Sequence, residues 1–530
     1  MLSSSLAPKL GWGWVLPWAL CALSLPVFFY GLGDYGIVNN DEGFYHYVAR
    51  QMARSGNWFR LVFVGEHRPY DTFMNAPWQY WIQALLILIL GDDYWSMRLL
   101  SASGGLLTVL MTYRLAAWLA GSTAGVLAGL VQLTTMQFVH LHSARTAELD
   151  AILAFLFTLI AYLFLRALET GRSFISHHAC LALLLGIKLP VIIMPLAAEA
   201  IFFALCPRAR RRWRDWTVSA LWVLPLGLLW HVGQALAHWD DFLVVMGSMR
   251  KEAGASEAKS LLGHLLVNGR FYGRTLVFGT FPWVAAYPFA VWSVLRGATP
   301  EARERWGLLA LFAAAVLGFF LLVGKANHWY VLPAYPFLSA FTGLWLARLL
   351  RERPGVAALL ACSIVLALVV WLRLEITDFN PYAQIARRAP MLFAWRGLAD
   401  LGPTVGVPLT AAAVLLALVG VRQVGKALPG SAGGILLGVL LAVASWRTLR
   451  PLAFTDYQSE MERTYRALRD TRETVAFPVP IHERGDLKVK YYFADDYRIQ
   501  NIRGRGRSGV YYLLYPKSAR EDARGDGGGG

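Results

Sequence analysis

The chain has 530 residues, of which 56% are hydrophobic and 16% charged, and its formal net charge is +16. Because a soluble protein carries charges on about a quarter of its residues, this composition excludes an ordinary soluble domain and predicts a polytopic membrane protein. A net positive charge can also indicate a nucleic-acid partner, but here the basic residues form short clusters between apolar runs. That distribution is the positive-inside pattern of membrane proteins, so no nucleic-acid partner is expected.

The first apolar run, Trp14 to Leu32, is long enough to cross a bilayer, and no small-residue cleavage site follows it. We therefore expect a retained first span. Residues 33–96 then form a predicted first extracytoplasmic loop, which contains the adjacent carboxylates Asp41 and Glu42. Carboxylates are costly inside a bilayer, so this pair belongs at the interface or in a wet cavity. The stretch Asp41 to Trp58 places apolar residues at helical spacing and predicts an amphipathic helix.

The basic clusters determine the predicted orientation of the later spans. The run Tyr80 to Leu90 is too short to span comfortably, and treating it as a span would place every later basic cluster outside. We therefore expect a surface or re-entrant helix there. The cluster Arg208 to Arg214 is the strongest inside signal and anchors the topology.

With these choices the chain has about 13 spans, with a long outer loop from His238 to Arg274 and the tail outside. Two of the spans are the short runs Ala179–Ile187 and Val191–Leu205. They are separated on the outer side by a break at Lys188-Leu189-Pro190, because proline disfavours helix in the residue before it. The other spans are expected at Met97–Leu119, Thr123–Val139, Ala151–Leu168, Trp216–Ala237, Leu276–Leu295, Trp306–Val323, Tyr330–Leu346, Val356–Leu372, Thr404–Val421 and Ile435–Trp446.

The predicted architecture is an α-helical polytopic membrane protein with two domains and a tail. Residues 1–449 form the transmembrane domain. Residues 450–517 form a small extracytoplasmic α/β domain, in which helical spacing over Tyr457–Arg472 precedes short β-rich runs separated by turn residues. These runs are Thr474–Pro478, Lys488–Phe493, Tyr497–Ile502 and Val510–Tyr515. Residues 518–530 are charged and glycine-rich, which predicts disorder.

Several charged residues collect on the predicted outer side, each beside an apolar span, and indicate a functional site there. They are Asp41 with Glu42, Glu148 with Asp150, Lys188, and Lys325 with His328. Simpler alternatives remain open. The first pair could end a helix in water, the two lysines could be snorkelling interfacial side chains, and Glu148 is expected at the surface. The four cysteines lie in or beside apolar runs, which favours packing over a metal site.

The same residues resemble motifs of the GT-C superfamily of polyprenyl-phosphate-sugar glycosyltransferases, which includes protein O-mannosyltransferases and bacterial aminoarabinose lipid A transferases. The matching pieces run in family order and are Asp41-Glu42 with Tyr45, Ala76-Pro77 with Tyr80-Trp81, Arg98-Leu99, Ala144-Arg145 with Asp150, Lys188 with Pro190, Phe281-Pro282-Trp283, and Lys325 with Tyr330, Pro333 and Tyr335-Pro336. The resemblance implies a GT-C type bundle with a long first extracytoplasmic loop.

The chain departs from this family pattern at two places. Where many relatives have a lysine before two prolines, it reads Met74-Asn75-Ala76-Pro77-Trp78, and the Lys-Gly-Pro of relatives is Lys188-Leu189-Pro190. In the family the first lysine is thought to hold the carrier phosphate. Its role would fall here to Lys188, Lys325, or a first-loop base such as Arg60 or Arg68. These departures leave the donor sugar open.

The resemblance implies inverting transfer of a sugar from a polyprenyl-phosphate donor to an extracytoplasmic lipid A, glycan or protein acceptor. Asp41 matches the family's first-loop acid and would be the general base. Basic residues would stabilise the departing phosphate, while Glu42 and Asp150 would orient the acceptor or the sugar. The remaining candidates for substrate contacts are Tyr45, Arg145, His328 and Tyr330.

Two functions of other classes are alternatives to a glycosyltransferase. A polyprenyl-lipid flippase or other transporter would show internal symmetry and charges near the span centres, and no internal repeat is evident in the sequence. A non-catalytic membrane scaffold would leave the outer-side charges unexplained. We expect a multi-pass protein of a bacterial inner membrane, surrounded by membrane lipids, whose site faces the periplasm. No cofactor or metal is expected, because clustered metal-ligand spacing is lacking.

Overall fold

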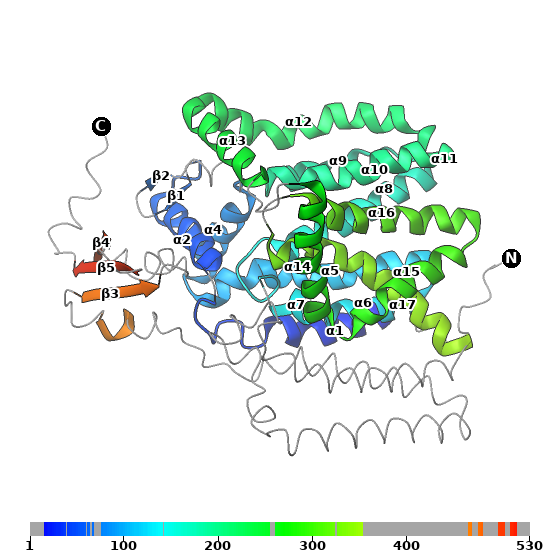
Figure 1. Ribbon diagram of the computed structural model, residues 1–530, viewed down its shortest axis with the longest axis horizontal. Helices are drawn as coiled ribbons and strands as arrows, with labels where there is room; N and C mark the ends of the chain where they lie inside the picture. The colour runs from blue at the N-terminus through cyan, green and yellow to red at the C-terminus, as the bar shows by residue number, and fades with distance from the viewer. Residues whose placement is uncertain are drawn as a thin grey trace, which may run out of the picture. The chain divides into compact units, whose positions relative to one another are not determined.

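A computed structural model of the chain describes residues 15–38, 40–59, 61–63, 66–67, 76–140, 142–254, 260–323, 326–352, 465–468, 475–480, 497–503 and 509–516, which are mostly helical (Figure 1). Outside them lie the predicted spans after residue 352, the predicted domain boundaries at 449 and 517, the run Lys488–Phe493, and the site candidates Arg60, Arg68 and Lys325. Contacts divide the chain into two compact units. The first comprises residues 1–30, 69–78 and 100–454, and the second comprises residues 31–68, 79–99 and 455–530.

Five helices of the described chain are long and apolar enough to cross a membrane. They are α5 (Tyr94–Ala120), α8 (Asp150–Thr170), α12 (Trp213–Ala237), α16 (Pro300–Leu322), and the run formed by η4 (His328–Ala334) with α17 (Tyr335–Glu352). Each coincides with a span predicted from hydropathy. Local signals mark their ends: the Thr299 side chain caps the first turn of α16, and Gly171 ends α8 in a left-handed conformation. The chain is a multi-pass membrane protein.

Shorter apolar helices complete the bundle of the first unit. They include α1 (Val15–Phe29), α6 (Ser122–Leu133), α9 (Ile175–Leu185) and α10 (Ile193–Leu205). α12 packs along α9, and α10 packs along α16, so that these helices lie side by side in Figure 1. The 3-10 turn η2 (Leu189–Ile192) separates α9 from α10, which confirms the predicted break at Lys188. The short helix α11 (Pro207–Arg210) follows α10.

The predicted span Thr123–Val139 is not one continuous helix. α6 ends before Thr134 and Thr135, and the short helix α7 (Met136–His140) follows them. Both threonine hydroxyls donate to carbonyls one turn earlier, at 2.6 and 2.8 Å, a contact that bends helices. Hydropathy treats this run as continuous because threonine is only weakly polar.

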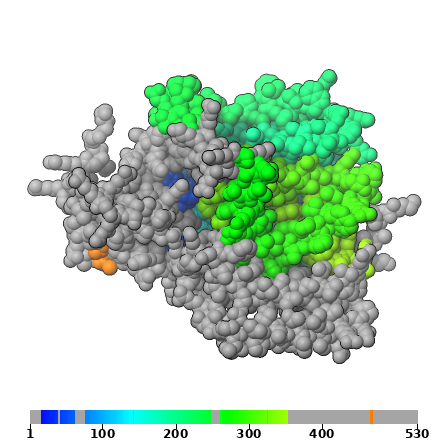
Figure 2. Space-filling view, viewed as in Figure 1, coloured from blue at the N-terminus to red at the C-terminus, as the bar shows by residue number. Residues whose placement is uncertain are grey.

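The predicted outer loop from His238 to Arg274 is mostly helical in the part that the structure describes. That range contains α13 (Trp239–Gly254) and much of α14 (Leu261–Thr280), whose first turn is capped by the Ser260 hydroxyl. α14 lies on the face of the first unit drawn in Figure 2, with several exposed leucines. Charged and polar residues interrupt its apolar positions, so a hydropathy window does not detect it.

The predicted span Leu276–Leu295 is divided for a different reason. α14 ends at Thr280, and the chain continues through the 3-10 turn η3 (Trp283–Ala285) into α15 (Tyr287–Arg296). Pro282 has no amide hydrogen to continue α14. The apolar run is therefore two helices rather than one span.

The second unit contains the long segment before α5 and part of the tail. Its elements are α2 (Asn40–Ser55), the antiparallel pair β1 (Val62–Phe63) and β2 (Glu66–His67), α4 (Trp78–Leu90), and the strands β3 (Val475–Pro480), β4 (Tyr497–Arg503) and β5 (Gly509–Pro516). The last three form an antiparallel sheet in the order β3-β5-β4. The strand predictions in these three places are confirmed, and α4 has the short length expected of the Tyr80–Leu90 run.

Close backbone contact joins α6 to α17 in the first unit. A Cβ atom on Gly343 would lie 2.5 Å from both the Ala124 carbonyl oxygen and the Ala128 amide nitrogen. Nearby, the Ser339 hydroxyl donates to the Gln132 amide oxygen at 3.0 Å. Small residues and buried polar pairs are what hold helices together in lipid, where apolar surface alone gives little preference for another helix.

The first prediction tests this helix contact. Gly343→Ala should destabilise the protein by about 1–3 kcal/mol, because the added methyl group meets backbone atoms that cannot rotate away. Gly318→Ala in α16 is the matched control, since no atom lies within 4 Å of its Cβ position. Thermal unfolding of the purified variants measures the difference. Equal stability of the two variants would show that α6 and α17 can separate without cost.

Candidate active site

Asp41 and Glu42 lie in the first turn of α2, and this helix confirms the predicted amphipathic segment. Successive residues of an α-helix point about 100° apart. Asp41 is therefore partly exposed while Glu42 is fully buried. The two adjacent carboxylates have different surroundings and cannot do the same work.

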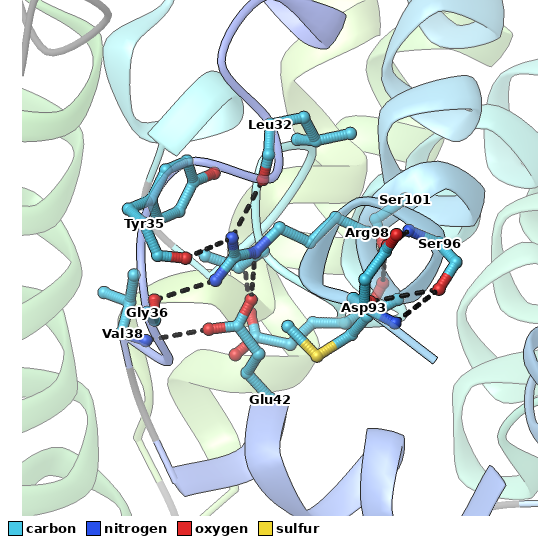
Figure 3. A network of polar contacts seen from close by, with 12 residues as sticks. Leu32, Tyr35, Gly36, Val38, Glu42, Asp93, Ser96, Arg98 and Ser101 are labelled. Carbon is cyan, nitrogen blue, oxygen red and sulfur yellow. Dashed lines mark hydrogen bonds and ion pairs between the residues drawn. The ribbon is translucent and has the colours of Figure 1, made fainter. Parts of the chain in front are cut away.

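Glu42 forms a buried ion pair with Arg98 of α5 (Figure 3). The Arg98 Nε donates to one carboxylate oxygen at 2.7 Å, and the Val38 amide donates to the other at 2.8 Å. The two terminal guanidinium nitrogens donate to backbone carbonyls of the segment before α2, those of Leu32, Tyr35 and Gly36, at 2.7–2.9 Å. The Glu42 oxygens thus contact Arg98 and the start of α2, and the expected role of Glu42 in orienting a substrate stays a prediction.

A second polar contact holds the middle of α2. Asp92 accepts a hydrogen bond from His46 at 2.7 Å and one from Arg54 at 3.2 Å, and Arg50 lies 3.9 Å away. Burial lowers the pKa of His46 below its ordinary value, although Asp92 opposes this shift. Burial would raise the pKa of Asp92, but the His46 hydrogen bond and the two arginines hold it below its ordinary value. α2 is therefore fixed beyond its first turn as well.

Tyr45, expected to contact substrate, lies in the core. Its ring is buried and packs against Phe44 and Tyr80, with ring centroids 5.7 and 5.9 Å away. Its expected stacking on a sugar stays a prediction.

In the first unit, His142 joins Glu148 and Asp150. Its Nδ1 lies 2.7 Å from a Glu148 oxygen and 3.2 Å from an Asp150 oxygen. The imidazole ring stacks on Trp329, with centroids 3.6 Å apart. Glu148 is fully buried, so the expectation that it lies at the surface is wrong. Asp150 is the first residue of α8, and its side chain is buried as well.

These three side chains also have the chemistry of a cation site. Their potential ligand atoms all lie within 4.8 Å of one another, and one imidazole with two carboxylates can bind a divalent ion. Spacing in the sequence did not show this, because the histidine comes from the irregular segment before α8. His142 has a left-handed backbone, with φ 56°, and this conformation turns its ring toward the acids.

Arg145, one of the predicted substrate contacts, lies against the end of α1. Its guanidinium is buried and donates to the carbonyls of Val27, Phe28 and Tyr30 at 2.8–3.2 Å. These carbonyls lie at the end of α1, where they have no partner within the helix. The residue caps α1.

Lys188 and Tyr330 are brought together from distant parts of the first unit. Lys188 lies between α9 and η2 with extended backbone, and its Nζ is 5.3 Å from the centre of the Tyr330 ring. Both residues are half-buried. This geometry holds an ammonium group beside an aromatic face, a contact between two separately predicted site residues that the sequence did not indicate.

His328, the last of the expected substrate contacts, is held on two sides. Its Nδ1 is 2.9 Å from the Thr275 hydroxyl, and its ring stacks on Phe271 with centroids 4.5 Å apart. Its carbonyl accepts a hydrogen bond from the Gln137 amide at 2.6 Å. Gln137 was not singled out in the sequence, since a glutamine within an apolar run carries no motif.

Comparison with known proteins agrees with the family resemblance that the sequence motifs indicate. The family model for dolichyl-phosphate-mannose-protein mannosyltransferases matches residues 74–232. An uncharacterised protein of Aquifex aeolicus is 27% identical over 323 residues, which are 60% of this chain and 61% of that protein. An undecaprenyl phosphate-alpha-4-amino-4-deoxy-L-arabinose arabinosyl transferase of Pseudomonas savastanoi is 33% identical over 97 residues, 18% of this chain and 17% of that protein. The chain thus spans less than two thirds of each of these relatives.

The fold is similar to that of ArnT from Cupriavidus metallidurans, solved with bound undecaprenyl phosphate. The TM-score is 0.59 at 16% identity, over 95% of this chain and 98% of that one. At this identity the likeness shows the fold alone. Together with the family model, it confirms the resemblance to GT-C glycosyltransferases that the sequence motifs indicated.

The second prediction concerns the buried ion pair. Arg98→Met should destabilise the protein by about 3–5 kcal/mol, because it leaves the Glu42 charge buried without its partner. Arg54→Met is the matched control. That side chain is mostly exposed in its contact with Asp92, and exposed pairs contribute about 0–1 kcal/mol. Denaturant unfolding in detergent measures both. Similar losses for the two variants would mean that the Glu42–Arg98 pair is not what fixes the start of α2.

Proposed function

We propose that the chain is a membrane glycosyltransferase that moves a sugar from a polyprenyl phosphate carrier to an acceptor, with inversion at the anomeric carbon. The acceptor class is lipid A, an envelope glycan or a protein. The enzyme works in a bacterial inner membrane, with its site on the periplasmic side. The family model, the name of the Pseudomonas savastanoi relative and the fold shared with ArnT support this class of reaction.

One observation carries the assignment of the general base. Of the two adjacent carboxylates, Glu42 is fully buried in its contacts with Arg98 and Val38, while Asp41 is partly exposed one residue earlier on the same rigid helix. An acceptor hydroxyl is a poor nucleophile until a base takes its proton. Asp41 is the member of the pair that a substrate can reach.

The proposed transfer is a single displacement. The acceptor oxygen attacks the anomeric carbon while its proton passes to the Asp41 carboxylate. The bond between that carbon and the phosphate oxygen breaks, and the electron pair leaves with the polyprenyl phosphate. A cation beside the phosphate stabilises the charge that develops on it.

Lys188 is the described residue that best fits the role of phosphate ligand. It is half-buried, its ammonium lies beside Tyr330, and the backbone around it is tightly hydrogen-bonded. Lys325, Arg60 and Arg68 stay proposed as further phosphate ligands. Asp150, coupled to Glu148 through His142, is proposed to orient the acceptor or the sugar.

The third prediction concerns Asp41. Asp41→Asn keeps the side chain's shape but removes its proton-accepting charge, so the transfer rate to a hydroxyl acceptor should fall by about 10²–10⁴-fold, with donor binding retained. Asp34→Asn, which changes an exposed carboxylate of the preceding segment, should leave the rate unchanged. The assay follows release of free polyprenyl phosphate from the sugar-charged carrier. An acceptor can be identified by mass spectrometry of envelope glycans from a deletion strain.

The outcomes of this assay separate the alternatives. A near-wild-type rate for Asp41→Asn with a hydroxyl acceptor would rule out the base assignment. With a phosphate acceptor the nucleophile is already ionised, so a mild effect there would move Asp41 to a binding role. Wild-type protein that moves the lipid across vesicles without breaking the sugar–phosphate bond would be a flippase, and protein with neither activity would fit a scaffold.

The fourth prediction concerns Lys188. Lys188→Met should weaken binding of undecaprenyl phosphate by roughly 10–10²-fold, because a charge-assisted contact to the phosphate contributes about 1.5–3 kcal/mol. Lys188→Arg should retain much of the affinity, since it keeps the charge. Titration of the lipid against purified protein measures the dissociation constants. Unchanged affinity in Lys188→Met would place the phosphate at Lys325, Arg60 or Arg68 instead.

A further inference from the structure

The backbone just before α4 is hydrogen-bonded to the break that carries Lys188. The Ala76 amide donates to the Ile187 carbonyl at 3.0 Å, and the Trp78 amide donates to the Gly186 carbonyl at 3.2 Å. Pro77 lies between them and has no amide hydrogen. Both segments belong to the first unit. The two residues that precede Lys188 are therefore each held by a donor more than a hundred positions earlier in the chain.

The indole ring of Trp78 lies directly over Gly186. A Cβ atom built on Gly186 would fall within bonding distance of Cδ1 and Nε1 of that ring, so no larger residue fits while the ring stays in place. The backbone itself does not require glycine there. Gly186 has φ −72° and ψ −1°, a conformation that any residue adopts. Within the described part of the chain, the three atoms nearest to this Cβ position all belong to the Trp78 ring.

Lys188 is also fixed by local hydrogen bonds. Its amide donates to the Leu184 carbonyl at 3.0 Å, and its own carbonyl accepts from Val191 in η2 at 3.3 Å. Between these contacts its backbone is extended, with φ −152° and ψ 103°. Its side chain therefore starts from a defined point and direction, which lowers the entropy that a flexible lysine loses on binding an anion.

We propose that Trp78 and Gly186 are positioning residues for Lys188, acting as a matched pair in which the ring fills the place of a missing side chain. Together with the Ala76 and Trp78 amides, they hold the end of α9 where the ammonium group can meet the carrier phosphate. The inference rests on the proposed role of Lys188 as a phosphate ligand. It adds that the affinity for the phosphate depends on contact between two segments far apart in sequence.

The test uses the full-length protein in detergent and undecaprenyl phosphate as the probe. Gly186→Ala should weaken binding by roughly 10–10²-fold, because moving the ammonium group away from the phosphate forfeits the charge-assisted contact that Lys188→Met removes. Gly233→Ala is the matched control, because no atom lies within 4 Å of the Cβ position at this glycine of α12. It should bind like the wild type. If Gly186→Ala only made the protein less stable overall, the variant would show a change in melting temperature rather than a selective loss of affinity for undecaprenyl phosphate.

Two double variants show how Gly186→Ala acts. In a Trp78→Ala background, which itself weakens binding, adding Gly186→Ala should change the affinity by less than about twofold, since the collision is gone. In a Lys188→Met background it should likewise add less than about twofold, since the group being positioned is absent. Additive losses in either background would overturn the inference.

Folding failure and failure of the proposed function are distinguishable. If Gly186→Ala alone does not yield folded protein, the double variant with Trp78→Ala is expected to fold and bind like Trp78→Ala. A double variant that also fails to fold would contradict the matched pair. If Lys188→Met binds undecaprenyl phosphate normally, the phosphate role of Lys188 is wrong and the inference falls with it. If Lys188→Met loses affinity while Gly186→Ala does not, the phosphate role stands and only the inference falls.

Discussion

The buried ion pair between Glu42 and Arg98 is the interaction on which the candidate base depends. Transferring two charges out of water costs several kcal/mol for each ion, and close contact with further hydrogen bonds is needed to offset that cost. Here the guanidinium meets one carboxylate and three backbone carbonyls, and the carboxylate also accepts an amide hydrogen. The pair therefore tolerates little movement. Because Glu42 lies in the first turn of α2, the ion pair fixes where this helix begins, and it thereby fixes the position of the adjacent Asp41.

Elsewhere in the described chain, polar side chains donate hydrogen bonds to backbone carbonyls where helices end or break. In lipid an unpaired backbone group costs several kcal/mol, so irregular segments need partners from other parts of the chain. Arg145 serves the end of α1, Gln137 serves His328 in η4, and Asn268 donates to three carbonyls at the end of α16. Each of these side chains looks, in the sequence, like a candidate ligand or an isolated polar residue. In the structure each donates hydrogen bonds to backbone carbonyls at a helix end or in an irregular segment.

This use of polar residues explains why a bundle built from apolar helices has charged groups at defined places. Lys188, His142 and His328 all lie outside regular α-helix, and all are held by hydrogen bonds or ring contacts from distant segments. A rigid frame around a short irregular segment limits the conformations of the side chain it carries. That is the condition for a charged group to bind one atom of a ligand rather than to remain in water.

The sequence by itself determined the membrane class, most of the described spans, the amphipathic helix that carries Asp41, the break at Lys188 and three strands of the tail. Hydropathy, helical spacing and proline act over neighbouring residues, so they can be read without knowledge of the fold.

Only the tertiary structure decided which of these residues are available to a substrate. Glu42 and Arg145 have the residue types and places of site groups, yet their partners are Arg98, 56 positions away, and the end of α1, more than a hundred positions away. The meeting of His142 with Glu148 and the stacking of His142 on Trp329 likewise depend on packing that hydropathy does not record. A charge buried against a distant partner and a charge facing a ligand have the same local sequence, and the fold alone separates them.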